Sequence, residues 1–209
     1  MEAAKSQSAV DAQLEEVVAA VDAGNGARAL EICRALAAQG NAVVQYNLGV
    51  LYEGAAGVTP DLGEALRWYS AAAEQGNAMA QYNLGVMYDQ GRGVAQDNEL
   101  ALTLFSRAAA LGHASAQTNL GVMYDNGQGV PQDVVRASQL FQAAAAQGNP
   151  IAQFNLASMY FHGVGVEQDF GQALTLYGLS AERGYLPAQT KVDEIVAAID
   201  AEKSPESPT

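Results

Sequence analysis

The sequence predicts an all-α fold, a right-handed superhelix (solenoid) of antiparallel helix pairs that repeat every 36 residues. The first observation behind this prediction is self-similarity. The stretch QYNLGVMYDQGRGVAQD at 81–97 returns 36 residues later as QTNLGVMYDNGQGVPQD, with 13 of 17 positions identical. Related stretches begin at Gln45 and Gln153 in the same register. A fixed period between 20 and 50 residues is typical of repeat architectures.

The second observation is that each period holds two helical segments bounded by turn residues. This pattern divides the chain into an N-terminal degenerate helix pair at 1–39, repeats at 40–75, 76–111, 112–147 and 148–183, a C-terminal capping helix at 184–200 and a disordered tail at 201–209. The end segments are expected to act as caps, because a repeat buries its apolar surface only against its neighbours.

The N-terminal cap is predicted to contain helices at 10–21 and 27–38. The C-terminal cap is predicted to be one helix, Tyr185–Asp200, with five apolar residues on one side: Ala188, Val192, Ile195, Val196 and Ile199.

The first helix of each repeat is predicted from about Ala42 to Glu53, where Val44, Leu48, Val50 and Tyr52 recur with helical spacing. Asparagine is favoured at helix N-caps. It precedes three of these helices, as Asn41, Asn77 and Asn149, whereas the third repeat has His113, a poorer cap.

The second helix is predicted from about Leu62 to Glu74. An aspartate that can accept hydrogen bonds from the first turn precedes it in every repeat: Asp61, Asp97, Asp133 and Asp169. Two repeats also fit a reciprocal capping box, Asp61 with Glu64 and Asp169 with Gln172. Glycines mark the ends of these helices: Gly76, Gly112, Gly148 and Gly184.

Small residues predict close contact between the two helices. Gly49, Gly85 and Gly121, with Ala157, recur after the core leucine of the first helix. A helix-interior glycine costs roughly 1 kcal/mol relative to alanine, so its recurrence indicates a close approach. Two aromatic ladders are expected to fill the core, Tyr69, Phe105, Phe141, Tyr177 and Tyr52, Tyr88, Tyr124, Tyr160.

The loop around Gly91 and Gly93 is predicted to be a structural joint, although Asp89 and Asp97 flank it. A catalytic loop is normally needed once, whereas this loop recurs in the repeats. It lacks the strand and third glycine of a dinucleotide fingerprint. Glycines at the third and fifth positions from Asp89 exclude an EF-hand.

Composition limits the partners and the compartment. The net charge is −13, with 10 Lys and Arg spread over the chain, so nucleic acid is not an expected partner. No apolar run is long enough for a membrane span. The single cysteine, Cys33, is expected to be a buried, unpaired thiol. If Met1 is the native start, we expect a cytoplasmic protein; a trimmed signal peptide would make it periplasmic or secreted.

These motifs resemble the Sel-one-like repeat, a relative of the tetratricopeptide repeat. The pattern A-x-A-Q-Y-N-L-G-V-M-Y-D-x-G-x-G-V-x-Q-D is matched closely by 78–97 and 114–133, and the resemblance covers 40–183. Two departures, Ala55 at the first loop glycine and Ala157 at the helix glycine, leave the local geometry open at those points.

The resemblance implies that the first helices line a concave groove that binds a partner. The implied groove positions are Val43, Tyr46, Asn47, Val50 and Glu53; Met79, Tyr82, Asn83, Val86 and Asp89; Ser115, Thr118, Asn119, Val122 and Asp125; and Ile151, Phe154, Asn155, Ser158 and Phe161.

Two features of these positions bear on binding. The asparagine recurs in every repeat, and its amide either bonds a peptide backbone or fixes the stacking of neighbouring repeats. The residue type varies at the repeat position of Tyr46, Tyr82, Thr118 and Phe154. This variation either determines specificity for a ligand or is evolutionary drift. No Lys or Arg occupies a groove position, so the expected ligand has apolar anchors and basic flanks.

The predicted function is a non-catalytic adaptor or scaffold for a protein or peptide segment, monomeric and with no cofactor, metal site or catalytic residues. Two alternatives stay open. One is an assembly element that self-associates. The other is β-lactam binding or hydrolysis, which the resemblance implies for a cysteine-rich branch whose paired cysteines are absent here.

Overall fold

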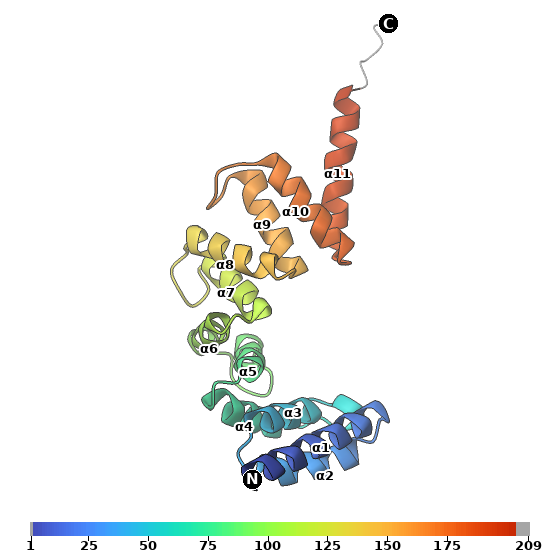
Figure 1. Ribbon diagram of the computed structural model, residues 1–209. Coiled ribbons are helices and arrows are strands. Elements are labelled where there is room, and N and C mark those ends of the chain that lie inside the picture. The colour runs from blue at the N-terminus through green and yellow to red at the C-terminus, as the bar shows by residue number, and fades with distance from the viewer. Residues whose placement is uncertain (1, 204–209) are drawn as a thin grey trace, which may run out of the picture. The chain divides into compact units, whose positions relative to one another are not determined.

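The structure, a computed structural model, describes the backbone of residues 2–203 (Figure 1) and the side chains of residues 12–198. Every regular element in this part of the chain is a helix. In chain order they are α1 Glu2–Asp22, α2 Gly26–Ala37, α3 Ala42–Tyr52, the short 3-10 helix η1 Ala55–Gly57, α4 Leu62–Glu74, α5 Ala78–Gln90, α6 Asn98–Ala110, α7 Ala114–Asn126, α8 Val134–Ala146, α9 Pro150–His162, α10 Phe170–Glu182 and α11 Leu186–Lys203.

The helices form two compact units, Met1–Leu111 and Gly112–Thr209. In unit 1 each helix from α1 to α6 packs against the next, and in unit 2 the same holds from α7 to α11. The pairs α3/α4, α5/α6, α7/α8 and α9/α10 are the four predicted helix pairs. The all-α repeat architecture is therefore confirmed.

The aspartates cap the second helices as predicted. Asp97 Oδ1 accepts a hydrogen bond from the Leu100 N–H at 2.9 Å, and the equivalent contacts of the other three aspartates are 2.9–3.0 Å. The predicted reciprocal half of the capping box is wrong. The backbone N–H of Asp61 donates to the Tyr52 carbonyl at 2.8 Å, and the Glu64 carboxylate instead accepts from Trp68 Nε1. The same bond to a tyrosine carbonyl recurs in every repeat and holds the loop against the first helix.

Removing one cap tests its contribution. Asp97→Ala is expected to lower the free energy of unfolding by about 1 kcal/mol, because the first turn of α6 loses an acceptor. Asp97→Asn, which keeps an acceptor oxygen at this position, is the matched control. It should lower the free energy of unfolding by only about a few tenths of a kcal/mol. Urea unfolding followed by circular dichroism measures both. Equal losses in the two variants would contradict a capping role for this side chain.

His113 caps α7 through its ring: Nδ1 accepts a hydrogen bond from the Ala116 N–H at 3.2 Å. Burial lowers the pKa of His113 below its ordinary value of 6.5. The neutral ring therefore contributes its full stability above about pH 6.5, and this contribution is lost as the pH falls toward the lowered pKa.

Replacing this cap should remove an acid sensitivity. His113→Asn is expected to raise the thermal midpoint more at about pH 5.5 than at about pH 7.5, because asparagine caps without titrating. Asn149→His, at the equivalent position of α9, should introduce the same sensitivity. Differential scanning calorimetry at both pH values checks the pair, and pH-independent differences would refute the assignment.

The glycine-pair loop joins α5 to α6, as predicted. Gly91 and Gly93 have φ values of +66° and +71°, a region that side-chain-bearing residues rarely adopt. A Cβ at Gly93 would also lie 2.6 Å from the Cβ of Leu62 in the preceding repeat. In the first repeat, where Ala55 replaces a glycine, the chain forms η1 instead, and Ala56 has a φ of +53°.

The helix glycines mark close contacts between paired helices. A Cβ at Gly49 would lie 2.5 Å from Tyr69 Cε1, and one at Gly85 or Gly121 would lie 2.7 Å from a ring carbon of Phe105 or Phe141. These rings are almost completely buried, so the first aromatic ladder forms the centre of each pair.

The caps differ in detail from the prediction. Both N-terminal helices are present, and α1 begins earlier than expected, at Glu2. Cys33 is buried in α2, and burial raises the pKa of its thiol to about 11. On α11, Ala188, Val192 and Ile195 pack against α9 and α10, but Val196 is exposed.

The end of α11 also differs from the predicted tail. Residues 201–203, expected to begin a disordered segment, belong to the helix. Residues 204–209 lie outside the described part of the chain, as does the Ile199 side chain.

Candidate protein-binding surface

The predicted groove residues lie on the first helices, α3 and α5 in unit 1 and α7 and α9 in unit 2. Most are half-buried: Tyr46, Asn47, Val50, Tyr82, Asn83, Val86, Asp89, Asn119, Val122, Asp125, Phe154, Asn155 and Ser158. Met79 is exposed. Thr118 contradicts the prediction, because it is 2% exposed and its hydroxyl donates to the Ala114 carbonyl within α7.

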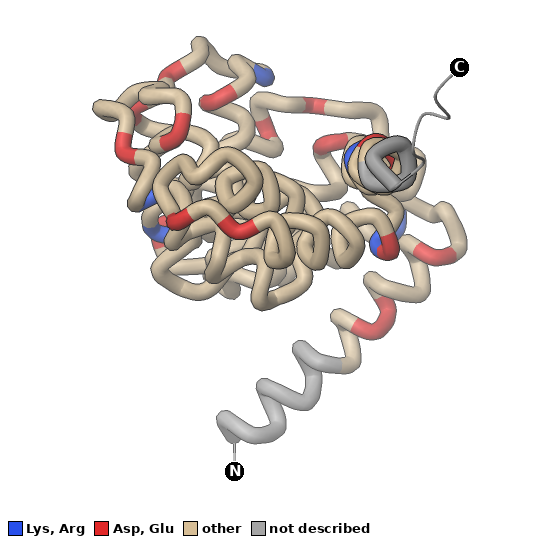
Figure 2. Tube along the Cα trace, turned by 90° about the horizontal axis from the view of Figure 1, so that it is seen from above, with Lys and Arg blue, Asp and Glu red and all other residues tan. Residues whose placement is uncertain are grey.

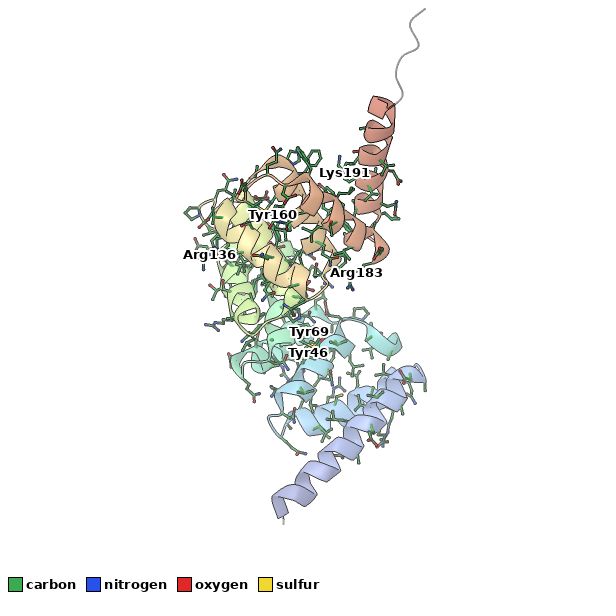
Figure 3. The ribbon with its side chains drawn as sticks, turned by 45° about the horizontal axis from the view of Figure 1, so that its top comes forward. Tyr46, Tyr69, Arg136, Tyr160, Arg183 and Lys191 are labelled. Atoms are coloured by element: carbon green, nitrogen blue, oxygen red, sulfur yellow. The ribbon has the colours of Figure 1, made fainter. Side chains whose placement is uncertain are left out.

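Three aromatic side chains at the variable position pack onto the buried ring of the paired helix. The ring centroids are 5.9 Å apart for Tyr46 and Tyr69 and for Tyr82 and Phe105, and 5.3 Å for Phe154 and Tyr177. Figure 3 labels the first of these pairs, Tyr46 and Tyr69. These groups therefore stabilise the helix pairs. A role in specificity remains a prediction for their exposed parts.

Asn83 contacts the preceding repeat rather than open space. Its amide lies close enough to the hydroxyls of Tyr46 and Tyr69 to lower their pKa values, against the larger rise caused by burial. Burial raises the pKa of Tyr69 well above its usual range, and the hydrogen bond that its hydroxyl donates to Glu53 Oε2, at 2.6 Å, raises it further. At this position the structure favours the repeat-stacking interpretation of the recurring asparagine.

An arginine outside the predicted positions neutralises the first acidic groove residue. Arg92, in the loop after α5, reaches back to Glu53 at the end of α3, with 3.0 Å between Nη2 and Oε1. The groove positions themselves hold no Lys or Arg, but this loop residue supplies a guanidinium group beside them. The sequence signal was the pairing of opposite charges between one repeat and the next loop.

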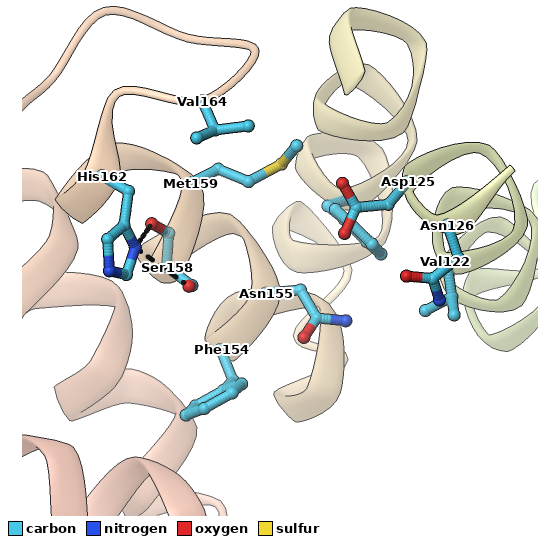
Figure 4. A pocket seen from close by; sticks show the side chains of 10 residues that line it. Val122, Asp125, Asn126, Phe154, Asn155, Ser158, Met159, His162 and Val164 are labelled. Carbon is cyan, nitrogen blue, oxygen red and sulfur yellow. Dashed lines mark hydrogen bonds between the residues drawn. The ribbon is translucent and has the colours of Figure 1, made fainter. Parts of the chain in front are cut away.

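Unit 2 contains a pocket of about 360 Å³ between α7 and α9 (Figure 4). Five predicted residues meet around it: Val122, Asp125, Phe154, Asn155 and Ser158. Sequence reasoning missed five others: Asn126, Phe141, Met159, His162 and Val164. Figure 4 shows Asp125 and Asn126 on the α7 side of the pocket and Asn155 and Ser158 on the α9 side.

The side chains around this pocket do not form a catalytic serine–histidine pair. His162 Nδ1 lies 2.8 Å from the Ser158 carbonyl oxygen and 3.4 Å from its hydroxyl oxygen. A carbonyl oxygen only accepts, so Nδ1 carries the proton and does not act as a base toward Ser158. Among the described residues, no group of three or more His, Cys, Asp or Glu side chains is placed to hold a metal ion.

Exposed apolar side chains recur near the starts of three of the first helices. Val43, Met79 and Ile151 occupy equivalent positions near the starts of α3, α5 and α9, and they are 51%, 52% and 44% exposed. Acidic residues outnumber basic ones along the chain, 23 against 10 (Figure 2). None of the helices in the described part of the chain has the length and apolar character that crossing a membrane requires.

Comparisons with known proteins agree with this architecture. The Sel1 repeat matches residues 42–77, 78–113, 114–149 and 150–185. A Sel1 repeat protein from Oxalobacter formigenes is 33% identical over 88% of this chain and 75% of its own, with a TM-score of 0.80.

Two further structures are similar. A protective antigen of uropathogenic Escherichia coli with an SLR fold is 36% identical over 81% of this chain, with a TM-score of 0.75. This chain covers only 36% of that antigen's length. An immunity protein from Pseudomonas aeruginosa is 26% identical over 85% of this chain and 67% of its own, with a TM-score of 0.56. A search of functionally curated proteins gave no match.

Proposed function

Because the chain belongs to the Sel1 repeat family, whose members typically act as scaffolds for protein interactions, we propose that it is a non-catalytic adaptor that binds a segment of a partner protein along its first helices. The observation that carries the proposal is the surface of α7 and α9. There, a pocket lined by a carboxylate and aromatic rings lies between the two helices, and Ile151 of α9 is exposed.

The chemistry of this surface defines the expected partner. In unit 1, exposed Val43 and Met79 offer contacts for apolar anchors. In unit 2, exposed Ile151 offers another such contact, and Asp125 offers a contact for a basic flank. Few interface residues supply most of the binding energy in such complexes, and these are commonly tryptophan, tyrosine or arginine side chains.

The test is a comparison of two double variants that each remove exposed apolar side chains. Met79→Ser with Ile151→Ser changes the first helices. Val135→Ser with Leu179→Ser, on the second helices α8 and α10, is the matched control because these residues are also exposed, by 54% and 40%. Tyr82 and Phe154 are unsuitable for this test, since both also pack inside helix pairs.

A partner is first isolated on immobilised wild-type protein and identified, and its affinity for each variant is then measured by calorimetry. The first-helix variant is expected to bind at least about tenfold more weakly, and the control to bind like wild type. Equal affinity in both variants would rule out the first helices as the binding surface. Light scattering of the free protein over a concentration range separates partner binding from self-association.

A further inference from the structure

We propose that the pocket between α7 and α9 binds the guanidinium group of an arginine side chain supplied by a partner protein. The inference rests on the proposed function, which it makes specific. It starts from a comparison of this pocket with the equivalent place in unit 1, where the chain provides a guanidinium group of its own.

In unit 1 the guanidinium group of Arg92 lies against Glu53, with 3.0 Å between the nearest nitrogen and oxygen. The side chains of Glu53 and Arg92 are 22% and 44% exposed. Two periods of 36 residues further along the chain, Asp125 takes the place of Glu53, and Val164 takes the place of Arg92. The carboxylate is thus kept in unit 2, whereas the arginine is lost.

Two other side chains near the pair of Glu53 and Arg92 in unit 1 are replaced by smaller ones in unit 2. Thr118 stands where unit 1 has Tyr46, so a ring is absent. Phe141 stands where unit 1 has Tyr69, so the hydroxyl that bonds the carboxylate is absent. The pocket of about 360 Å³ is lined by Phe141, Asp125 and Val164, which stand where unit 1 has Tyr69, Glu53 and Arg92.

Asp125 and Asn155 of the pocket lack the neighbouring groups that Glu53 and Asn83 have in unit 1. No Lys or Arg in the described part of the chain forms an ion pair with Asp125. Asn83, the counterpart of Asn155, lies close to the hydroxyls of Tyr46 and Tyr69, and these two tyrosines are replaced at the Asn155 site by Thr118 and Phe141. The Asp125 carboxylate and the Asn155 carbonyl oxygen can therefore both accept hydrogen bonds from a ligand.

These acceptors suit a guanidinium group better than an ammonium group. Arginine presents five N–H donors in a planar fork that can bond a carboxylate and a second acceptor together. Its plane also stacks on aromatic faces, and the ring of Phe154 borders the pocket. That ring is held in place by Tyr177 and Tyr185, each with its centroid 5.3 Å away.

The experiment is a titration of the ¹⁵N-labelled full chain with Nα-acetyl-arginine amide, followed by NMR. Nα-acetyl-citrulline amide, which keeps the shape without the charge, and Nα-acetyl-lysine amide are the ligand controls. The expected result is a set of shifts confined to α7, α9 and the loop at Val164. The citrulline ligand is expected to bind at least about tenfold more weakly and the lysine ligand several-fold more weakly.

Two variants and one control locate the site. Asp125→Asn should weaken binding of the arginine amide by about tenfold or more, because a charge-assisted hydrogen bond is lost. Val164→Arg should also prevent binding, because it restores the pairing seen between Glu53 and Arg92. Val135→Arg, which adds the same charge at an exposed residue of α8 that does not line the pocket, should bind like wild type. Circular dichroism confirms that all three are folded.

Arginine-amide binding that is unchanged in Asp125→Asn, or matched by citrulline, would overturn the inference, as would the absence of any shift. The same experiments distinguish a failure of this inference from a failure of the proposed function. A partner that depends on Met79 and Ile151, together with no arginine-amide binding, would overturn this inference and leave the adaptor function in place. Arginine-amide binding without such a partner would support the guanidinium site itself and overturn the adaptor function proposed for the first helices.

Discussion

Gly49→Ala is expected to lower the free energy of unfolding by about 2 kcal/mol, although alanine is the better helix former. The new Cβ would lie 2.5 Å from Tyr69 Cε1, in the centre of the α3/α4 pair. The Tyr69 ring is fully buried, and the 2.6 Å hydrogen bond from its hydroxyl to Glu53 holds it in place. Overpacking should therefore outweigh the roughly 1 kcal/mol that alanine gains over glycine inside a helix.

The matched control is Gly178→Ala, in the interior of α10, where a Cβ would have no heavy atom within 4 Å. This variant should gain about 0.5–1 kcal/mol from helix propensity. Urea unfolding of the two variants and the wild type gives both differences. Stabilisation of similar size in both variants would show that the α3/α4 contact is not as close as described.

The fourth repeat shows how the aromatic rings pack when alanine replaces the helix glycine. Ala157 occupies the equivalent position there, and the rings of Phe154 and Tyr177 are inclined at 60°, compared with 35° for Tyr46 and Tyr69. The ring arrangement thus differs where the methyl group is present. In the first repeat the bond between Tyr69 and Glu53 opposes a similar adjustment.

Phe154→Ala is expected to lower the free energy of unfolding by about 2–3 kcal/mol, somewhat less than for a fully buried phenylalanine. The Phe154 ring lies between Tyr177 of α10 and Tyr185, the residue before α11, with both centroids 5.3 Å away. Its removal leaves a cavity and loosens the packing of α11. Hydrogen exchange should therefore accelerate most in α11.

Phe170→Ala is the matched control, because Phe170 is 58% exposed and its described ring contact is with Phe161 alone. It should cost less than about 1 kcal/mol. Urea unfolding measures the stabilities, and hydrogen exchange followed by mass spectrometry measures the local effect. Unchanged exchange in α11 in Phe154→Ala would contradict the role given to this ring in holding the closing helix.

Local sequence features determined the helices and the turns between them. The aspartate caps, the glycine-pair loops and the apolar stripes act within one repeat, over a few residues. They therefore predict Leu62–Glu74 as a helix and the loop at Gly91 and Gly93 as a joint. The close contact at Gly49 was also predictable, because a glycine that recurs inside a helix weakens that helix unless a neighbouring group needs the space of its side chain.

The candidate site was predicted only in part, because its geometry depends on which side chains meet across successive repeats. Thr118 was predicted to face a ligand, but the adjacent helix packing buries it. The pairing of Arg92 with Glu53, and its absence at Asp125, joins residues that lie in different repeats. The sequence by itself determined the helices, the caps and the turns of each repeat. Only the tertiary structure decided which groups are paired and which remain free, because a side chain's partner is set by the neighbouring repeat and not by its own.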